Sequence, residues 1–442
     1  MNPNLLCAGC MKEVRSLDVP CPRCGYINRE YQKTRSKRAL PPYTILAGRY
    51  LIGIPLGEGG FGITYLAMDL KNEEVVAVKE FFPVGVVTRN TFVSDTDFSV
   101  RYVTGSKIDI KQVYRHGLES FANEANNMMR FRDLPGVVTV KKFFQQNSTA
   151  YLVMEFIDGM TLKQYLNKRR RPVSEDTVLK VMRPVLHALA QIHKSGFIHR
   201  DISPENIMLS KNGRVALIDF GAARVSTGTE TQTMTIVLKR GYAPIEQYHT
   251  RGKQGPWTDI YGVCATMYAM LSGITPVESV ERIQVDKLIP LKTLRQQNPE
   301  INVSSHTSDV ISKGLAVYAQ NRFQDARELF EALYGTRIND EVSRDSGRKN
   351  TEYTVANTDF NHSANHYRTD DTRYEENNET GYSEDYGYNS NRNSDNEWSS
   401  LFERYESLPT NEKVGATILI GIGILVVLIL LGSIIGGLMT PL

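Results

Sequence analysis

The sequence predicts an α+β fold, preceded by a small metal-binding ribbon and followed by a tether and a membrane-spanning helix. Three observations support this prediction. Four cysteines crowd the first 24 residues, strand-like and helix-like segments alternate through the middle, and a 26-residue run near the C-terminus has no charge. The predicted parts are a zinc ribbon (1–28), a basic linker (29–42), the central domain (43–335), a disordered polar and acidic tether (336–412) and a transmembrane helix (414–439).

The composition suits a cytoplasmic chain of two or three domains. Of 442 residues, 41% are hydrophobic, which is enough to bury a substantial core. The net charge of +3 is spread unevenly, with a basic first forty residues and an acidic stretch from 370 to 400, and we expect no nucleic-acid partner. The five cysteines and the lack of an apolar signal-peptide core indicate a reducing compartment.

The N-terminal cysteines form two CxxC pairs separated by ten residues: Cys7 with Cys10, and Cys21 with Cys24. Four thiolates can hold structural Zn²⁺ tetrahedrally at a Zn–S distance of about 2.3 Å. A loop this short lacks a core of its own, so the metal would supply its folding energy. The alternative is a redox dithiol pair. The basic run that follows, REYQKTRSKR, is interpreted as a solvated linker rather than a nucleic-acid or lipid patch.

The central domain shows the periods of both strands and helices. Apolar runs predict strands at 49–56, 63–70, 75–82 and 151–157, the first two around a glycine turn. A helical period predicts a long helix at 177–196 that ends at Gly196. The segment 259–273 is apolar nearly all round, which predicts a buried helix with Cys264 in the core.

The C-terminal quarter has two different compositions. Residues 336–412 contain almost no aliphatic side chains and are predicted to be a disordered tether spanning roughly 50 Å. The following 26 residues would extend about 39 Å as a helix, enough to cross a hydrocarbon core of about 30 Å. The sequence therefore predicts a single-pass, tail-anchored protein whose other parts lie on the cytoplasmic side of the cell membrane, and Lys413 agrees with that orientation.

A glycine-rich motif opens the chemistry of the central domain. In GEGGFG, Gly57, Gly59 and Gly62 form a GxGxxG pattern, which dinucleotide-binding folds also use between a strand and a helix. Here strand-like sequence follows the glycines instead, and Lys79 lies on the next strand. A flexible hairpin over the phosphates, with a lysine beside it, favours a nucleoside triphosphate.

The segment from about 50 to 335 resembles the catalytic domain of bacterial serine/threonine protein kinases of the eukaryotic type. The motifs GEGGFG, AVK, HRDISPEN, DFG and PIE, followed by a buried helix, occur in that family's order. The resemblance implies a bilobal protein-kinase fold, ATP with Mg²⁺ or Mn²⁺, and transfer of the γ-phosphate to Ser/Thr hydroxyls of proteins. A catalytically silent scaffold and a small-molecule phosphotransferase remain alternatives.

The resemblance also implies roles for individual residues. Asp201 would accept or orient the substrate proton, and Asn206 and Asp219 would ligate Mg²⁺. Lys79 would hold the α/β-phosphates and pair with a helix glutamate, for which Glu124 is favoured over Glu119 although the intervening chain is unusually long. The nucleotide contacts implied are Leu56, Gly57, Gly59, Gly62, Ala77, Lys79, Glu124, Glu155, Ile157 and Met208.

Two further features support the resemblance. Glu246 of PIE can pair with Arg322, and Asp259 should bind the backbone of the catalytic loop from below. Arg200 before the catalytic aspartate suggests autophosphorylation, in trans if the chain forms a homodimer. Candidate phosphorylation sites in VSTGTETQTMT are Ser226, Thr227, Thr229, Thr231, Thr233 and Thr235.

One departure from the family pattern concerns the catalytic loop. Ser203 stands where a serine/threonine kinase has a lysine, and Lys239, counted back from Glu246, stands where the family has a threonine. We hypothesise that the two groups have exchanged places and that Lys239 supplies the missing positive charge. The alternative is a solvent-facing pair, Lys239 and Arg240, that recognises acidic substrates or nothing.

Overall fold

The computed structural model describes residues 2–27, 36–89, 97–103, 109–219, 238–249 and 252–338. Residues 339–412 of the predicted tether and the predicted membrane helix lie outside these residues, as do the six candidate phosphorylation sites. The first residues of the predicted tether are described, and Ile338 is only 4% exposed in the main core, so the central domain extends past its predicted end at 335. Among the described residues, no helix is both long and apolar enough to cross a bilayer.

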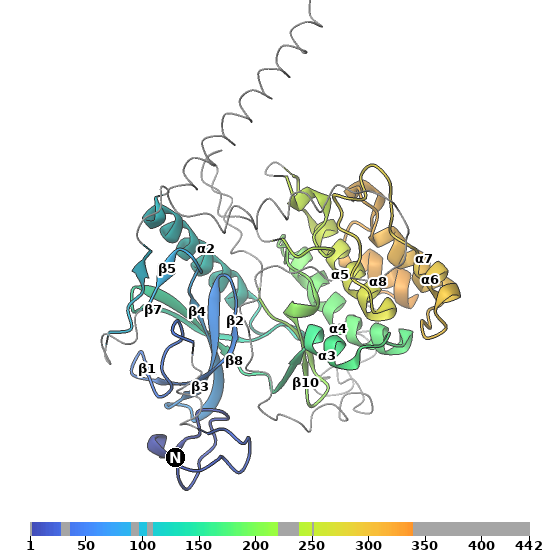
Figure 1. Cartoon of the computed structure of the whole chain (residues 1–442). Coiled ribbons are helices and arrows are strands. Elements are labelled where there is room, and N and C mark those ends of the chain that lie inside the picture. The colour runs from blue at the N-terminus through green and yellow to red at the C-terminus, as the bar shows by residue number, and fades with distance from the viewer. Residues whose placement is uncertain are drawn as a thin grey trace, which may run out of the picture. The chain divides into compact units, whose positions relative to one another are not determined.

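The first part of the central domain is a six-stranded antiparallel sheet with the order β1-β2-β3-β4-β8-β7 (Figure 1). Its strands are β1 (Ile45–Leu46), β2 (Tyr50–Glu58), β3 (Gly62–Asp69), β4 (Glu74–Phe81), β7 (Val140–Gln146) and β8 (Thr149–Glu155). Helix α2 (Ile110–Arg130) contacts β7 and β8, and the Asp109 side chain caps its first turn by accepting from the Gln112 amide. All four strands expected from the sequence are confirmed.

The second part is helical, so the expected two-lobed α+β arrangement is confirmed (Figure 1). Its helices are α3 (Leu162–Arg169), α4 (Glu175–Lys194), α5 (Pro256–Ser272), α6 (Leu291–Gln297), α7 (Ser305–Gly314) and α8 (Ala326–Tyr334). It also contains a small sheet of β9 (Gly159–Thr161), β10 (Ile207–Ser210) and β11 (Val215–Leu217), and 3₁₀ turns at Pro204–Asn206, Ile245–Gln247 and Ala319–Asn321. Outside this part, β5 (Val87–Thr88) pairs with β6 (Arg101–Tyr102) between β4 and α2, and Pro3–Leu5 is a 3₁₀ turn near the N-terminus. Helix α5 is buried around its whole circumference and Cys264 is fully buried in it, as predicted.

The sheet lobe begins before its predicted boundary. Ala39 and Leu40 are fully buried in the main core, and the Leu40 amide donates to the Tyr65 hydroxyl at 3.0 Å. The assignment of 29–42 as a solvated linker is therefore wrong at its C-terminal end. The basic run that precedes these two apolar residues concealed their burial.

The long connection between β4 and α2 is anchored by a buried ion pair. The Arg89 guanidinium contacts the Glu80 carboxylate with both side chains fully buried. Arg89 also donates to the backbone carbonyls of Arg38, at 2.7 Å, and Phe98, at 2.8 Å. Arg89 thus holds the described part of this connection against β4.

Replacing Arg89 by alanine should lower the free energy of unfolding by about 3–5 kcal/mol, because the Glu80 carboxylate would stay buried without its cation. The matched control is Arg101→Ala in the same connection, whose exposed ion pair with Asp97 is screened by solvent, so the free energy of unfolding should stay close to that of the wild type. Chemical denaturation measures both. Equal losses for the two variants would contradict this account of the connection.

Candidate active site

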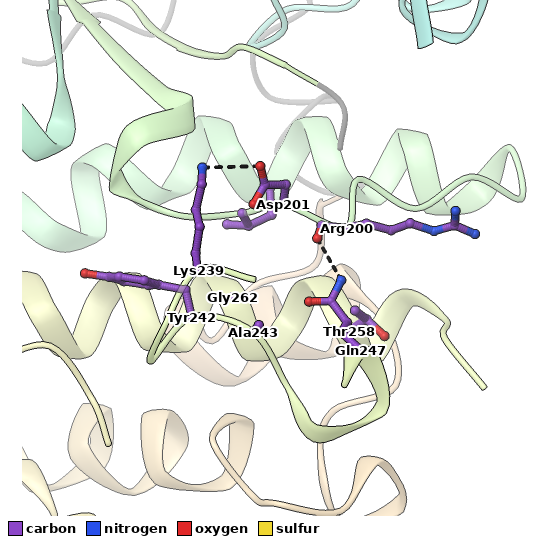
Figure 2. A pocket seen from close by; sticks show the side chains of 9 residues that line it. Arg200, Asp201, Lys239, Tyr242, Ala243, Gln247, Thr258 and Gly262 are labelled. Carbon is purple, nitrogen blue, oxygen red and sulfur yellow. Dashed lines mark hydrogen bonds and ion pairs between the residues drawn. The ribbon is translucent and has the colours of Figure 1, made fainter. Parts of the chain in front are cut away.

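One buried carboxylate, that of Asp259, binds the backbone of the loop HRDISPEN (residues 199–206). Asp259 of α5 accepts from the backbone amides of His199, at 2.8 Å, and Arg200, at 2.7 Å, and its carboxylate lies 2.9 Å from His193 Nε2. Burial would raise the pKa of Asp259, but the hydrogen bonds to His193 and the loop amides hold it below its ordinary value. The side chain of Gln247 donates to the Arg200 carbonyl at 2.8 Å (Figure 2). The loop backbone is therefore fixed on two sides, as expected for Asp259.

Within this loop, Asn206 and Asp201 are joined by hydrogen bonds. The Asn206 amide nitrogen donates to the Asp201 carboxylate at 2.8 Å and to the Asp201 carbonyl at 2.7 Å. Because the side-chain nitrogen of Asn206 donates these two hydrogen bonds, the side-chain oxygen of Asn206 is the atom that could bind a metal ion. Carboxylate and amide oxygens are the ligands that Mg²⁺ prefers.

The β4 lysine links the sheet to the residue predicted as a metal ligand. Lys79 Nζ lies 2.7 Å from Asp219 Oδ1 and 3.5 Å from Glu124 Oε1 on α2. The other candidate on that helix, Glu119, has a 63% exposed side chain and lies beside His116 instead. The glutamate that pairs with Lys79 is thus Glu124, the favoured candidate.

Charge holds these three groups together. Burial would lower the pKa of Lys79, but the carboxylates of Asp219 and Glu124 outweigh it and hold that pKa above its ordinary value. Burial raises the pKa of Glu124 to about 7, against the opposing effect of Lys79. The pKa of Asp219 stays below its ordinary value despite burial, because Lys79 stabilises the carboxylate. We infer a charged lysine that shares its charge between two carboxyl groups.

A second ammonium group reaches the catalytic loop from outside it. Lys239 Nζ donates to Ser203 Oγ at 2.9 Å and lies 3.2 Å from Asp201 Oδ2 and 3.3 Å from Glu205 Oε2. Figure 2 shows Lys239 and Asp201 pointing toward one another. Its neighbour Arg240 has an 89% exposed side chain. The two basic residues therefore differ in their surroundings, and the hydroxyl and ammonium groups of the hypothesised exchange are in direct contact.

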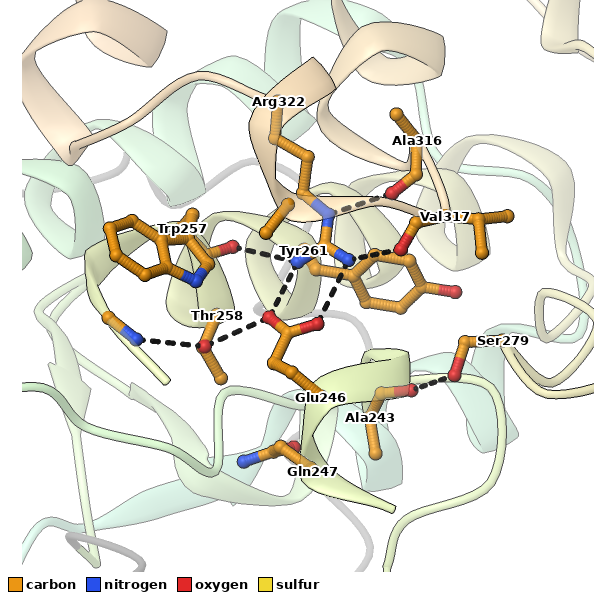
Figure 3. A network of polar contacts seen from close by, with 12 residues as sticks. Ala243, Glu246, Gln247, Trp257, Thr258, Tyr261, Ser279, Ala316, Val317 and Arg322 are labelled. Carbon is orange, nitrogen blue, oxygen red and sulfur yellow. Dashed lines mark hydrogen bonds and ion pairs between the residues drawn. The ribbon is translucent and has the colours of Figure 1, made fainter. Parts of the chain in front are cut away.

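The segment that carries Lys239 is anchored to the helical lobe. Arg322 donates to both carboxylate oxygens of Glu246, at 2.7 and 3.1 Å, and the Thr258 hydroxyl donates to Glu246 at 3.0 Å (Figure 3). The backbone turns at Gly241, where φ is +78° and an added Cβ would lie 2.4 Å from the Pro276 carbonyl oxygen. The predicted Glu246–Arg322 pair is present, and together with this turn it sets the direction of Lys239.

The other residues assigned to nucleotide binding lie on the sheet lobe and at its junction with the helices. The glycines of GEGGFG are in the turn between β2 and β3 and at its edges, and Leu56 just before them is exposed. Ala77 lies on β4 and Met208 on β10, whereas Glu155 ends β8 and Ile157 follows it. The Glu155 carboxylate pairs with Arg214 at 2.7 Å and accepts from the Thr139 backbone amide at 2.8 Å. The Glu155 backbone amide donates to the Thr139 carbonyl at 2.9 Å, so both its side chain and its amide already have partners.

Sequence reasoning missed Gln247 and Glu205 as parts of the site. Gln247 holds the loop at Arg200, and Glu205 adds a carboxylate next to Lys239. A glutamine next to Glu246 and a glutamate before Asn206 show no pattern that marks either contact. Phe220 and Gly221 of the DFG motif lie outside the described residues.

The four N-terminal cysteines meet in one cluster. Their Sγ atoms all lie within 4.8 Å of one another, with 3.6 Å between Cys7 and Cys24 and 3.9 Å between Cys10 and Cys21. A tetrahedron with Zn–S distances of about 2.3 Å has S–S edges of about 3.8 Å, so these separations fit a bound zinc ion. Burial raises the pKa of Cys7 to about 11, whereas at Cys21 hydrogen bonds from the backbone amides of Cys24 and Arg23 outweigh burial and lower the pKa to about 7.

Comparisons with known proteins identify the family. Residues 50–334 match the protein kinase domain. The chain is 32% identical over 302 residues to serine/threonine-protein kinase F of Synechocystis sp., covering 67% of this chain and 57% of that protein. It is 30% identical over 293 residues to probable serine/threonine-protein kinase PknB of Lactococcus lactis, covering 64% and 41%. The chain thus spans about half the length of these curated relatives.

A solved structure supports the same conclusion. The chain is 34% identical to the structure titled PpkA-294 apo form, with a TM-score of 0.59, and the match covers 67% of this chain and 99% of that one. With its sheet lobe, its helical lobe and the family match over most of the chain, the protein belongs to the protein kinase family.

Proposed function

We propose that the protein is an ATP-dependent serine/threonine kinase that transfers the γ-phosphate of ATP to hydroxyl groups of protein substrates. Lys79 binds the α/β-phosphates, and Asp201 orients the substrate hydroxyl and accepts its proton. Asn206 and Asp219 would hold Mg²⁺ or Mn²⁺, whose charge offsets that of the phosphates when it is bound. The chemistry is then positioning and charge stabilisation.

The observation that supports this proposal most is the position of Lys239. Its ammonium lies within 3.3 Å of both Ser203 and Asp201, so the catalytic loop has a cation although it lacks its own lysine. A positive charge stabilises the charge that develops on a transferring phosphoryl group, and removing one preorganised donor from a water-poor site costs about 2.7–4 kcal/mol of transition-state stabilisation. This arrangement supports a phosphotransferase over a catalytically silent scaffold.

The anchored segment after Lys239 favours protein over a small molecule as the phosphate acceptor. The buried pair of Glu246 and Arg322 fixes this segment on the helical lobe, directly beside the catalytic loop. A fixed backbone next to Asp201 can support a polypeptide that presents its hydroxyl. A generic protein acceptor that remained unlabelled while a small alcohol was phosphorylated would favour the alternative.

Lys239→Ala should lower the rate of ³²P transfer from ATP to a protein acceptor by about 10²–10³-fold, because the γ-phosphate loses a charged donor. Arg240→Ala is the matched control and should stay near the wild-type rate, since its side chain is exposed. Asp201→Ala gives the background. The double variant Ser203→Lys with Lys239→Thr should regain part of the activity. A fully active Lys239→Ala enzyme would rule out the exchange.

We also propose that the four cysteines hold one structural Zn²⁺. The support is the fit of their spacing to a tetrahedral thiolate site and the burial of Cys7 and Cys21.

The purified full-length chain should therefore contain about one zinc per molecule, as four thiolates saturate the ion. Elemental analysis measures this. Cys21→Ser should lose most of the metal, whereas Cys264→Ser, which removes a thiol buried in α5, should keep it. Equal zinc in both variants would count against the site.

We further propose autophosphorylation in trans within dimers, supported by Arg200 before Asp201 and by the six hydroxyl residues between 226 and 235.

We also propose that residues 414–439 anchor the protein in the cell membrane, with the kinase domain in the cytoplasm, where ATP is available. The support is the uncharged 26-residue run. Full-length protein should sediment with membranes after a high-salt wash, and deletion of 414–439 should release it. A deletion variant that sediments as before would disprove the anchor.

A further inference from the structure

The ribbon is packed onto the sheet lobe through an apolar cluster of its own. Leu6 and Met11 of the ribbon, each 1% exposed, are buried against Leu51 of β2 and Leu66 and Met68 of β3. This cluster is separate from the main core of the sheet lobe. Removing these apolar side chains from water stabilises the contact, so the ribbon is docked rather than loosely attached.

Strand register shows which face of the sheet the ribbon covers. Thr64 pairs with Lys79, and Leu66 pairs with Ala77. Directly opposite residues project from the same face of an antiparallel pair, and so do residues two positions apart on a strand. Leu66, which contacts the ribbon, therefore lies on the face of the sheet that carries Lys79 and Ala77. The Leu66–Ala77 pair is farther from the glycine-rich turn than the Thr64–Lys79 pair.

The segment that joins the two lobes packs against the same cluster. Phe156, between the proposed base-recognition residues Glu155 and Ile157, is partly buried against it. The cluster that the ribbon shares with β2 and β3 therefore also includes the connecting segment at the edge of the sheet.

The closest contact is at a break in the β2–β3 ladder. The register shifts between Ile52 and Pro55, and the amide of Ile54 donates to the Ala8 carbonyl of the ribbon at 3.1 Å. At Gly53 an added Cβ would lie 2.2 Å from Met11 Cε and 2.4 Å from the Ala8 oxygen. Only glycine fits here, so the ribbon occupies the place of a side chain.

The contacting atoms belong to the turn that carries the first two proposed zinc ligands, Cys7 and Cys10. Ala8 lies between Cys7 and Cys10, and Met11 follows directly, with φ at +55°. The Met11 amide donates to the Cys7 carbonyl at 2.7 Å. The conformation that presents Ala8 and Met11 to β2 is thus the turn of the first CxxC pair, which a metal bound to these cysteines would fix.

We propose that the ribbon forms the outer wall of the base end of the nucleotide site, and that its metal sets nucleotide affinity by holding β2 and the Phe156 segment in place. This inference rests on the proposed ATP-binding function. Losing the metal frees the first CxxC turn, withdraws the Ala8 carbonyl from Ile54 and uncovers the apolar face. The protein then spends less time in the conformation that binds, which weakens apparent affinity in proportion.

Calorimetric titration of the full-length chain measures its affinity for a non-hydrolysable ATP analogue in the presence of Mg²⁺, and separately for adenosine. Four forms are compared: the wild type, the wild type stripped of zinc with a zinc-selective chelator and returned to Mg²⁺, the Met11→Ala variant and the Gly53→Val variant. Val19→Ala, an exposed position of the same ribbon, is the matched control. Hydrogen exchange of the 50–58 peptide reports docking directly, and thermal unfolding shows whether each variant folds.

The ribbon-released forms should bind both ligands about tenfold more weakly, as expected if the competent fraction falls to about a tenth, with faster exchange in 50–58. The control should match wild type. Unchanged affinity in stripped protein and in Met11→Ala would overturn the proposal and leave phosphotransfer intact, as would equal weakening in Val19→Ala. Should Gly53→Val fail to fold, the milder Met11→Ala and the stripped protein still decide. A wild type that binds neither ligand would overturn the kinase assignment itself.

Discussion

Carboxylates gathered in a half-buried site repel one another, and the site of this protein depends on the two ammonium groups that hold them in place. Lys79 lies between Glu124 and Asp219, and Lys239 lies among Asp201, Glu205 and Ser203. Each lysine joins elements that are distant in the sequence. The first links β4, α2 and the DFG aspartate, and the second links the anchored segment to the catalytic loop. Without these cations the carboxylates would have to protonate or separate.

The surrounding polar contacts serve the same end. Asp259 holds the loop backbone that carries Asp201, and the Glu246–Arg322 pair holds the segment that carries Lys239. The sheet lobe adds a buried pair, Arg89 with Glu80, at the start of the connection leading to α2. The ribbon packs on a different region, the part of the Lys79 face that lies farther from the glycine-rich turn. The catalytic charges and the proposed base site therefore have independent supports.

Much of this could be predicted from the sequence because it depends on local patterns. Short apolar runs predicted the strands, uniform apolarity predicted the buried α5, and the cysteine spacing predicted a four-thiolate cluster. The position of Lys239 could be anticipated only because Ser203 left a charge missing. Other contacts arise from tertiary packing that leaves no periodic signal: the burial of Leu40, the role of Arg89 and the docking of Met11 on Gly53. The predicted membrane helix and phosphorylation sites lie outside the described residues and remain predictions.

The central claim is that the catalytic loop receives its cation from Lys239. The most direct measurement is a crystal structure of the protein with Mg²⁺ and a non-hydrolysable ATP analogue. The account predicts Lys239 Nζ at about 3 Å from a γ-phosphate oxygen, within hydrogen-bonding distance, while Ser203 and Asp201 stay beside it. A Lys239 side chain turned to solvent, with another cation at the γ-phosphate, would contradict it.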